Sequence, residues 1–146
     1  MRKSVAVVVL ALSAGACTSP SPWMEAYGPN FPQSNPGEAA LYVVRDATAA
    51  DATPINLTIG RRPVGSLTGL TYMRFDLQPR LYDLHAYGLQ EGTEQIITVA
   101  PGQTRFIQVE ATPTGGVQFL EIAPGDGRRM VRQGQRLQQL QDPPRD

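Results

Sequence analysis

Three side chains in the middle of the chain are of the types that perform hydrolytic catalysis, namely Ser66, Asp83 and His85. His85 is the only histidine among the 146 residues, and Asp83 precedes it by two positions. A catalytic triad needs the serine hydroxyl within hydrogen-bond reach of the imidazole, with the carboxylate orienting the ring. Ser66 is predicted in or beside a turn, away from the strand that carries the other two. We therefore interpret Asp83 and His85 as neighbouring polar residues on a solvated strand face, and we expect no enzymatic activity.

Metal, cofactor and nucleotide chemistry have little support in the sequence. One histidine and one cysteine are too few to build a zinc site. Asp126 lies between two glycines, but no run of alternating acidic residues makes a calcium loop. The glycine-rich motifs that hold the phosphates of nucleotides are also missing. We expect neither a metal ion nor a cofactor.

The charge balance argues against a nucleic-acid partner. The chain has 13 Lys and Arg residues and 13 Asp and Glu residues, so its formal net charge is zero. Without Arg2 and Lys3, which lie in the N-terminal segment, 11 basic and 13 acidic residues remain. A protein that binds nucleic acid through its phosphates normally carries a basic excess.

The N-terminus has the features of a secretory signal. Arg2 and Lys3 precede an unbroken apolar run at residues 5–12, and small residues follow at 13–16. Eight apolar residues are far fewer than the roughly 20 that cross a bilayer as a helix. We therefore predict a signal peptide over residues 1–16 and not a permanent transmembrane anchor.

The residues around Cys17 indicate how the chain is attached after cleavage. Residues 14–17, Ala-Gly-Ala-Cys, resemble the lipobox of bacterial lipoproteins, in which cleavage between Ala16 and Cys17 exposes an acylated cysteine. In the alternative, an ordinary signal peptidase cuts near Ala16 and leaves Cys17 unmodified. Cys17 is the only cysteine, which favours lipid attachment and excludes an intrachain disulfide. Because Thr18 and not Asp follows, we expect the outer membrane, with the protein facing the periplasm.

Residues 17–37 are predicted to form a tether. This segment contains five prolines and almost no hydrophobic periodicity, which is typical of an extended linker. Three aromatic residues interrupt it at four-residue spacing: Trp23, Tyr27 and Phe31. They are interpreted as anchors at the lipid interface, as docking residues for a partner, or as residues that fold back onto their own domain.

Residues 38–123 have the pattern of an all-β domain. Short segments with period-two alternation are separated by turn residues every 8–14 positions, as in an antiparallel β-sandwich of about seven or eight strands. The expected strands are 40–45, 55–59, 63–67, 71–77, 81–87, 94–99, 104–110 and 117–122.

The alternation also separates inward from outward side chains. At 81–87, residues 82, 84 and 86 are predicted to face the core, which turns Asp83, His85 and Tyr87 to the solvent. Tyr72 is predicted to point outward from the strand at 71–77. These four residues, Tyr72, Asp83, His85 and Tyr87, are the candidate binding surface.

The C-terminal segment, residues 124–146, is basic and rich in glutamine. Four arginines occur without an intervening acid at 128, 129, 132 and 136, and a thin apolar stripe is formed by Met130, Val131, Leu137 and Leu140. We expect a short amphipathic helix that ends before Pro143. Its basic face either contacts anionic lipid or cell-wall polymer, or the helix packs on the domain.

Four segments in this order resemble a known family. They are Ala-Ala-Leu-Tyr-Val-Val-Arg at 39–45, the hairpin at 55–67, Thr-Tyr-Met-Arg-Phe-Asp-Leu-Gln-Pro at 71–79, and the turn and strand at 99–109, with Pro-Gly-Gln-Thr at 101–104. The chain is similar to the domain of unknown function 2846 family, which comprises short bacterial lipoproteins with a β-sandwich-like domain. The resemblance implies location and fold, and it implies no functional residue.

Two classes of function follow from these observations. The first is a lipid-anchored, non-catalytic module of the cell envelope that binds another envelope protein or cell-wall glycan such as peptidoglycan, and that contacts the membrane through lipidated Cys17. The alternative is a periplasmic carrier or sensor of small ligands with an apolar cavity inside the β domain. A pocket of several hundred cubic ångströms at the mouth of the sandwich would favour the carrier.

Overall fold

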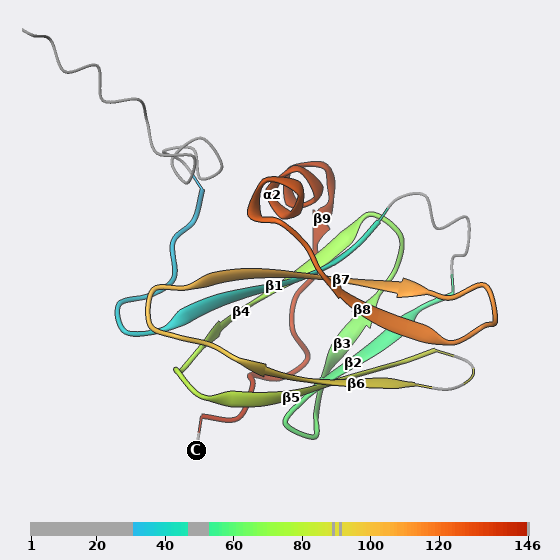
Figure 1. Ribbon diagram of the computed structural model, residues 1–146, viewed down its shortest axis with the longest axis horizontal. Coiled ribbons are helices and arrows are strands. Elements are labelled where there is room, and N and C mark those ends of the chain that lie inside the picture. The colour runs from blue at the N-terminus through green and yellow to red at the C-terminus, as the bar shows by residue number, and fades with distance from the viewer. Residues whose placement is uncertain (1–30, 47–52, 89, 91, 146) are drawn as a thin grey trace, which may run out of the picture.

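The computed structural model describes residues 31–46, 53–88, 90 and 92–145, and in these ranges the chain is mostly β, with two sheets and one helix (Figure 1). The elements are β1 (Ala39–Arg45), β2 (Ile55–Ile59), β3 (Arg62–Leu67), β4 (Thr71–Leu77), β5 (Leu81–Tyr87), β6 (Thr93–Thr98), β7 (Thr104–Ala111), β8 (Val117–Glu121), α2 (Pro124–Gln133) and β9 (Gln135–Arg136). The predicted signal peptide, the Ala16–Cys17 cleavage site and most of the tether lie outside the described residues.

The strands form a five-stranded sheet in the order β8-β7-β1-β4-β9, called sheet A, and a four-stranded sheet in the order β3-β2-β5-β6, called sheet B. Each of the eight expected strands is present, with ends within one residue of the predicted bounds. The prediction of a purely antiparallel arrangement is wrong for sheet A, because β1 pairs parallel with β7 and β4 pairs parallel with β9. The short strand β9, which brings the described strands to nine, was not predicted.

Sheets A and B enclose one hydrophobic core in a sandwich-like arrangement (Figure 1). Alternation creates this core: every second residue of β2 and β4 is buried, and the residues between them are not. Leu41 and Phe75 of sheet A belong to the same cluster as Leu57 and Leu84 of sheet B. Removal of this apolar surface from water is the main source of stability for the two sheets.

A second, smaller cluster covers the outer face of sheet A. It consists of Phe31, Ala40, Tyr42, Val44, Phe106 and Val131, with Tyr72, Ile122 and Met130 packed against it. Strand β1 therefore has a hydrophobic cluster on each side, and all seven of its residues are buried. Its sequence fits this position because it is an apolar run without alternation, as in strands buried on both faces.

Helix α2 supplies much of this cover and lies across sheet A (Figure 1). Pro124 occupies the start of the helix, where its missing N–H costs no hydrogen bond. Gly127 allows the helix backbone to approach the sheet, because a Cβ at this position would overlap the Phe106 ring. Val131, one turn later, is buried against the same cluster.

After α2 the chain becomes extended, contrary to the expectation that Leu137 and Leu140 continue a helical stripe. The Gln135 N–H donates to the Leu70 carbonyl at 2.8 Å, and the Leu137 N–H donates to the Tyr72 carbonyl at 2.8 Å. The Leu140 N–H then donates to the Val64 carbonyl at 2.9 Å. The extended tail satisfies backbone groups at the edges of both sheets, which a helix would leave unpaired.

No helix in the described ranges is long and apolar enough to cross a membrane.

Candidate functional site

The structure does not bring the four predicted surface residues together. Asp83, His85 and Tyr87 lie on the outer face of sheet B, as their alternation predicts, and the His85 and Tyr87 rings are 5.7 Å apart. Tyr72 lies on β4, on the outer face of sheet A, where it packs against the second cluster. Because the core separates the two outer faces, Tyr72 cannot share a binding surface with the other three.

Ser66 and His85 do not form a nucleophile and base pair. The Ser66 hydroxyl donates to Asn56 Oδ1 at 2.5 Å, and Asn56 is on β2, the strand between β3 and β5. Two strand spacings separate Ser66 from His85, which corresponds to roughly 10 Å. Within the described ranges, His, Cys, Asp and Glu side chains also make no cluster of three or more suited to a metal ion.

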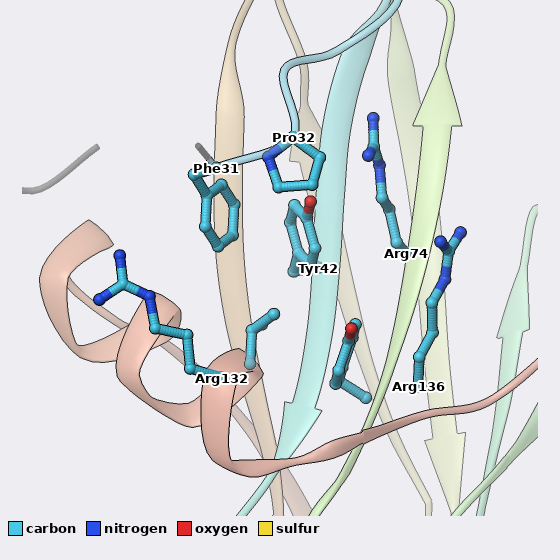
Figure 2. A pocket seen from close by; sticks show the side chains of 8 residues that line it. Phe31, Pro32, Tyr42, Arg74, Arg132 and Arg136 are labelled. Atoms are coloured by element: carbon cyan, nitrogen blue, oxygen red, sulfur yellow. The ribbon is translucent and has the colours of Figure 1, made fainter. Parts of the chain in front are cut away.

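The most developed concave site lies on the outer face of sheet A. It is an open pocket of about 440 Å³ between α2, the two strands β1 and β4, and the segment at Phe31 (Figure 2). Its lining residues are Phe31, Pro32, Tyr42, Tyr72, Arg74, Val131, Arg132 and Arg136. We call it the arginine-rimmed pocket.

Tyr42 forms the floor of the arginine-rimmed pocket. Its ring stacks on Phe106 with centroids 5.0 Å apart and meets Phe31 at 5.3 Å, so the side chain is only 2% exposed. Figure 2 shows its hydroxyl directed toward the Pro32 end of the pocket. Among the described residues this hydroxyl has no hydrogen-bond partner. A buried hydroxyl without a partner costs about 1–3 kcal/mol of desolvation, which an acceptor admitted by a shift of the covering side chains would recover.

Arg74 stands beside Tyr42 on the neighbouring strand. The guanidinium carbon is 5.7 Å from the Tyr42 ring centroid. Its Nη2 group donates to Asp76 Oδ1 at 2.8 Å and to the Gln33 carbonyl at 2.7 Å. Its Nε–H is buried and finds no acceptor in the described ranges. Tyr42 and Arg74, which line the pocket, therefore each have one buried donor without an acceptor among the described residues, the Tyr42 hydroxyl and Arg74 Nε.

Arg132 of α2 and Arg136 of β9 complete the rim of the pocket. Both side chains are exposed, and no carboxylate in the described part of the chain forms an ion pair with either. Arg129, in contrast, pairs with Asp126 at 2.9 Å and does not line the pocket. Arg74, Arg132 and Arg136 all line the pocket, although the Arg132 guanidinium is directed away from Tyr42 (Figure 2), and among the described residues the carboxylate paired with one of them is Asp76. The pocket thus has a net positive charge and suits an anion.

Burial raises the pKa of the Tyr42 phenol above its ordinary value, because the ionised form loses hydration. The positive charges of Arg74 and Arg136 oppose this shift but do not reverse it. Tyr42 is therefore a neutral O–H donor at physiological pH, which is the form that binds an anionic acceptor.

Sequence reasoning identified only part of this site. The sequence predicts a basic helix face from the run of arginines without an intervening acid. Arg128 does not belong to such a face, because it is buried and its guanidinium carbon lies 4.3 Å from the Phe31 ring centroid. Tyr42 and Arg74 were missed, although the unalternating run at 39–45 indicated a strand covered on both sides. Phe31 follows one of the interpretations given above, because it folds back onto its own domain. Trp23 and Tyr27 lie outside the described residues.

A second pocket lies at one end of the two sheets, where the alternative function requires a ligand cavity. Its volume is about 150 Å³, and it is lined by Arg45, Ile55, Gly88 and Val117, among others. This is less than the several hundred cubic ångströms expected of a carrier.

Neither a protein-family model nor a curated protein matches this chain.

Proposed function

We propose that the protein is a lipid-anchored, non-catalytic binding module of the bacterial cell envelope, and that the arginine-rimmed pocket binds an anionic group of its partner. The observation that carries the proposal is the pair of buried donors, the Tyr42 hydroxyl and Arg74 Nε, which have no acceptor among the described residues. Arg132 and Arg136 add positive charge at the same opening. Every polar side chain of the pocket except the rotatable tyrosine hydroxyls is a donor only, as in a receptor for oxygen anions.

Binding is better supported than catalysis. The pocket is lined by aromatic, apolar and arginine side chains, and it has no nucleophile next to a general base. Asp76 forms an ion pair with Arg74 and does not line the pocket. Ser66 and His85 lie on the other sheet and apart from each other.

The anchor in this proposal is Cys17. The charged pair, the apolar run and the small residues before a lone cysteine support cleavage after Ala16, followed by acylation of the thiol. The proposed location is the outer membrane, with the domain facing the periplasm. The proposal includes a β-sandwich domain and membership of the domain of unknown function 2846 family, in keeping with the four ordered segments.

Envelope proteins and cell-wall glycans both carry anionic groups, and either class satisfies the requirement of the pocket. The carrier of small apolar ligands is less well supported, because the pocket beside Ile55 is small and the open pocket of about 400 Å³ at the opposite turns has charged walls, among them Arg80 and Asp83. An arginine rim also does not suit a purely apolar ligand.

The proposal is tested by cross-linking in intact membranes, followed by mass spectrometry of the captured partners and of the peptide that begins at Cys17. We expect two or three acyl chains on that peptide and cross-links from residues at the rim of the pocket. Cys17→Ser is the matched control, and it should release the chain from the membrane fraction. An unmodified Cys17 in a soluble wild-type chain would refute the anchor.

A further inference from the structure

We infer that the arginine-rimmed pocket binds the phosphate group of an anionic phospholipid in the same membrane that holds the acyl chains of Cys17. This inference rests on the proposed function for the anchor, and it specifies the ligand of the pocket. It predicts that the folded domain binds the membrane surface directly in addition to being tethered to it.

The donor set of the pocket matches a phosphate diester. Tyr42 offers one O–H and Arg74 offers one buried N–H, and both lack an acceptor in the described part of the chain. Arg136 offers further N–H groups at the opening, and Arg132, whose guanidinium is directed away from Tyr42 (Figure 2), adds positive charge nearby. A phosphate oxygen accepts several charge-assisted hydrogen bonds at once, which a neutral sugar hydroxyl or amide cannot do equally well.

The walls of the pocket suit the part of a lipid next to its phosphate. Phe31, Tyr72 and Val131 line the pocket and belong to the second cluster or pack against it. Phe31 and Val131 are 7% and 9% exposed, so the walls present a small apolar surface beside the charged rim, where a glycerol backbone and the first methylene groups would make contact. A free inorganic anion would leave these walls in contact with water.

The position of the pocket relative to the anchor favours the membrane over the cell wall. Phe31, a wall of the pocket, follows Cys17 after the thirteen residues at 18–30. A proline-rich chain of that length spans about 40 Å when it is extended and about 45 Å at most. With the proposed anchor, the pocket therefore stays within about 45 Å of the leaflet that carries the acyl chains, where lipid phosphate is concentrated and each arginine adds attraction.

The test is native mass spectrometry of the mature acylated protein extracted in detergent. Dioleoyl phosphatidylglycerol is titrated first, then dioleoyl phosphatidylcholine, and glycerol 3-phosphate, a phosphate monoester, is used as a soluble source of phosphate. We expect a one-to-one adduct with phosphatidylglycerol, a weaker adduct with phosphatidylcholine, and the weakest binding with glycerol 3-phosphate because it lacks the apolar part.

Variants locate the lipid in the molecule. Arg136→Ala should weaken phosphatidylglycerol binding by about five- to tenfold, the effect of removing one arginine near an anionic headgroup. Tyr42→Phe should also weaken it, because the hydroxyl loses its role as a donor without a change in shape. Arg129→Ala is the matched control, since it removes the same charge from helix α2 outside the pocket, and it should change affinity by less than twofold.

Three results would overturn the inference. The first is equal phosphatidylglycerol affinity in wild type, Arg136→Ala and Tyr42→Phe. The second is tighter binding of glycerol 3-phosphate than of the lipid, which would make the ligand a soluble phosphate. The third is retention on isolated peptidoglycan that Arg136→Ala abolishes, without any lipid adduct. The mass of the Cys17 peptide is read in the same experiment, so a failure of the anchor is distinguished from a failure of the lipid site.

Discussion

The outer faces of the two sheets differ in what covers them. On sheet A, α2 and Phe31 cover Tyr42 and Phe106, and β1 is buried on both of its sides. On sheet B, β5 alternates strictly between buried and solvent-facing residues, and Ile96 on the neighbouring strand β6 is 67% exposed. Only sheet A has a second hydrophobic cluster on its outside in the described part of the chain.

This difference explains where the candidate site lies. On a flat, solvated sheet face the side chains are exposed to water and do not enclose a pocket, and His85 is an exposed side chain of this kind. A partly covered face has walls, and the incomplete cover between α2 and β4 leaves the arginine-rimmed pocket. The two buried donors without an acceptor among the described residues, the Tyr42 hydroxyl and Arg74 Nε, lie beneath this partial cover.

The largest effect on the covered outer face of sheet A is expected when the Phe106 ring is removed. Phe106→Ala deletes a side chain that is 1% exposed and stacks on Tyr42, so we expect the free energy of unfolding to fall by about 3–5 kcal/mol. Ile96→Ala, on the outer face of sheet B, should change it by less than about 0.5 kcal/mol. Equilibrium unfolding in urea of the full chain measures both. Equal losses for the two variants would contradict the asymmetry.

A smaller loss is expected when α2 is pushed away from sheet A. Gly127→Ala places a Cβ into the Phe106 ring, and we expect a loss of about 1–3 kcal/mol. Gly125→Ala is the matched control, because a Cβ there meets open space and alanine is the better helix former. Thermal unfolding should show a lower midpoint for the first variant and an unchanged or higher midpoint for the second. A harmless Gly127→Ala would mean that the helix is not seated on Phe106.

Tyr42→Phe should separate stability from binding. It removes a buried hydroxyl that has no partner among the described residues, so we expect the ligand-free protein to become more stable by up to about 1 kcal/mol. The same change should weaken anion binding. A loss of stability in the ligand-free variant would indicate that the hydroxyl is satisfied within the protein.

The same residue predicts a pH dependence. Because the pKa of Tyr42 is raised in the folded protein, the unfolded chain loses this proton first as the pH rises past about 10. The contribution of Tyr42 to stability is therefore present below pH 10 and is lost progressively as the pH approaches the folded-state pKa. Urea unfolding between pH 9 and pH 11 should show a shallower decline for Tyr42→Phe than for wild type. Identical slopes would contradict the raised pKa.

The smallest effect is expected on sheet B. His85→Ala removes an exposed side chain whose ring contact is with Tyr87, so the free energy of unfolding should change by less than about 0.5 kcal/mol. Lipid binding should be unchanged, because β5 lies across the core from the arginine-rimmed pocket. A loss of binding in this variant would mean that the binding site lies on sheet B and not on sheet A.

The strands were predictable because their residues carry the periodicity directly. The sequence at 71–77 places Met73 and Phe75 on one face and Arg74 on the other, and burial follows this alternation. The strand pairing was less predictable, because the parallel contact of β1 with β7 joins Tyr42 to Phe106, which are far apart in the sequence. Period-two alternation indicates which face a residue takes but not which strand lies beside it.

The arginine-rimmed pocket could not be predicted, because its walls come from segments that are far apart in the sequence. Arg74 appeared to be one of three outward polar residues on its strand, and nothing local in the sequence shows that Phe31 and α2 cover that face. The end of the helix was also unpredictable from apolar spacing, because Leu137 fits a helical stripe. The edge of β4 instead takes up residues 135–137 through backbone hydrogen bonds.

Nuclear magnetic resonance of the full chain, titrated with short-chain phosphatidylglycerol, compares the two outer faces in one experiment. We predict that amide shifts change at residues 42, 72–74 and 131–136 around the arginine-rimmed pocket, with no change at 83–87 on β5. Changes centred on β5, or distributed equally over both sheets, would contradict the assignment of the binding site to sheet A.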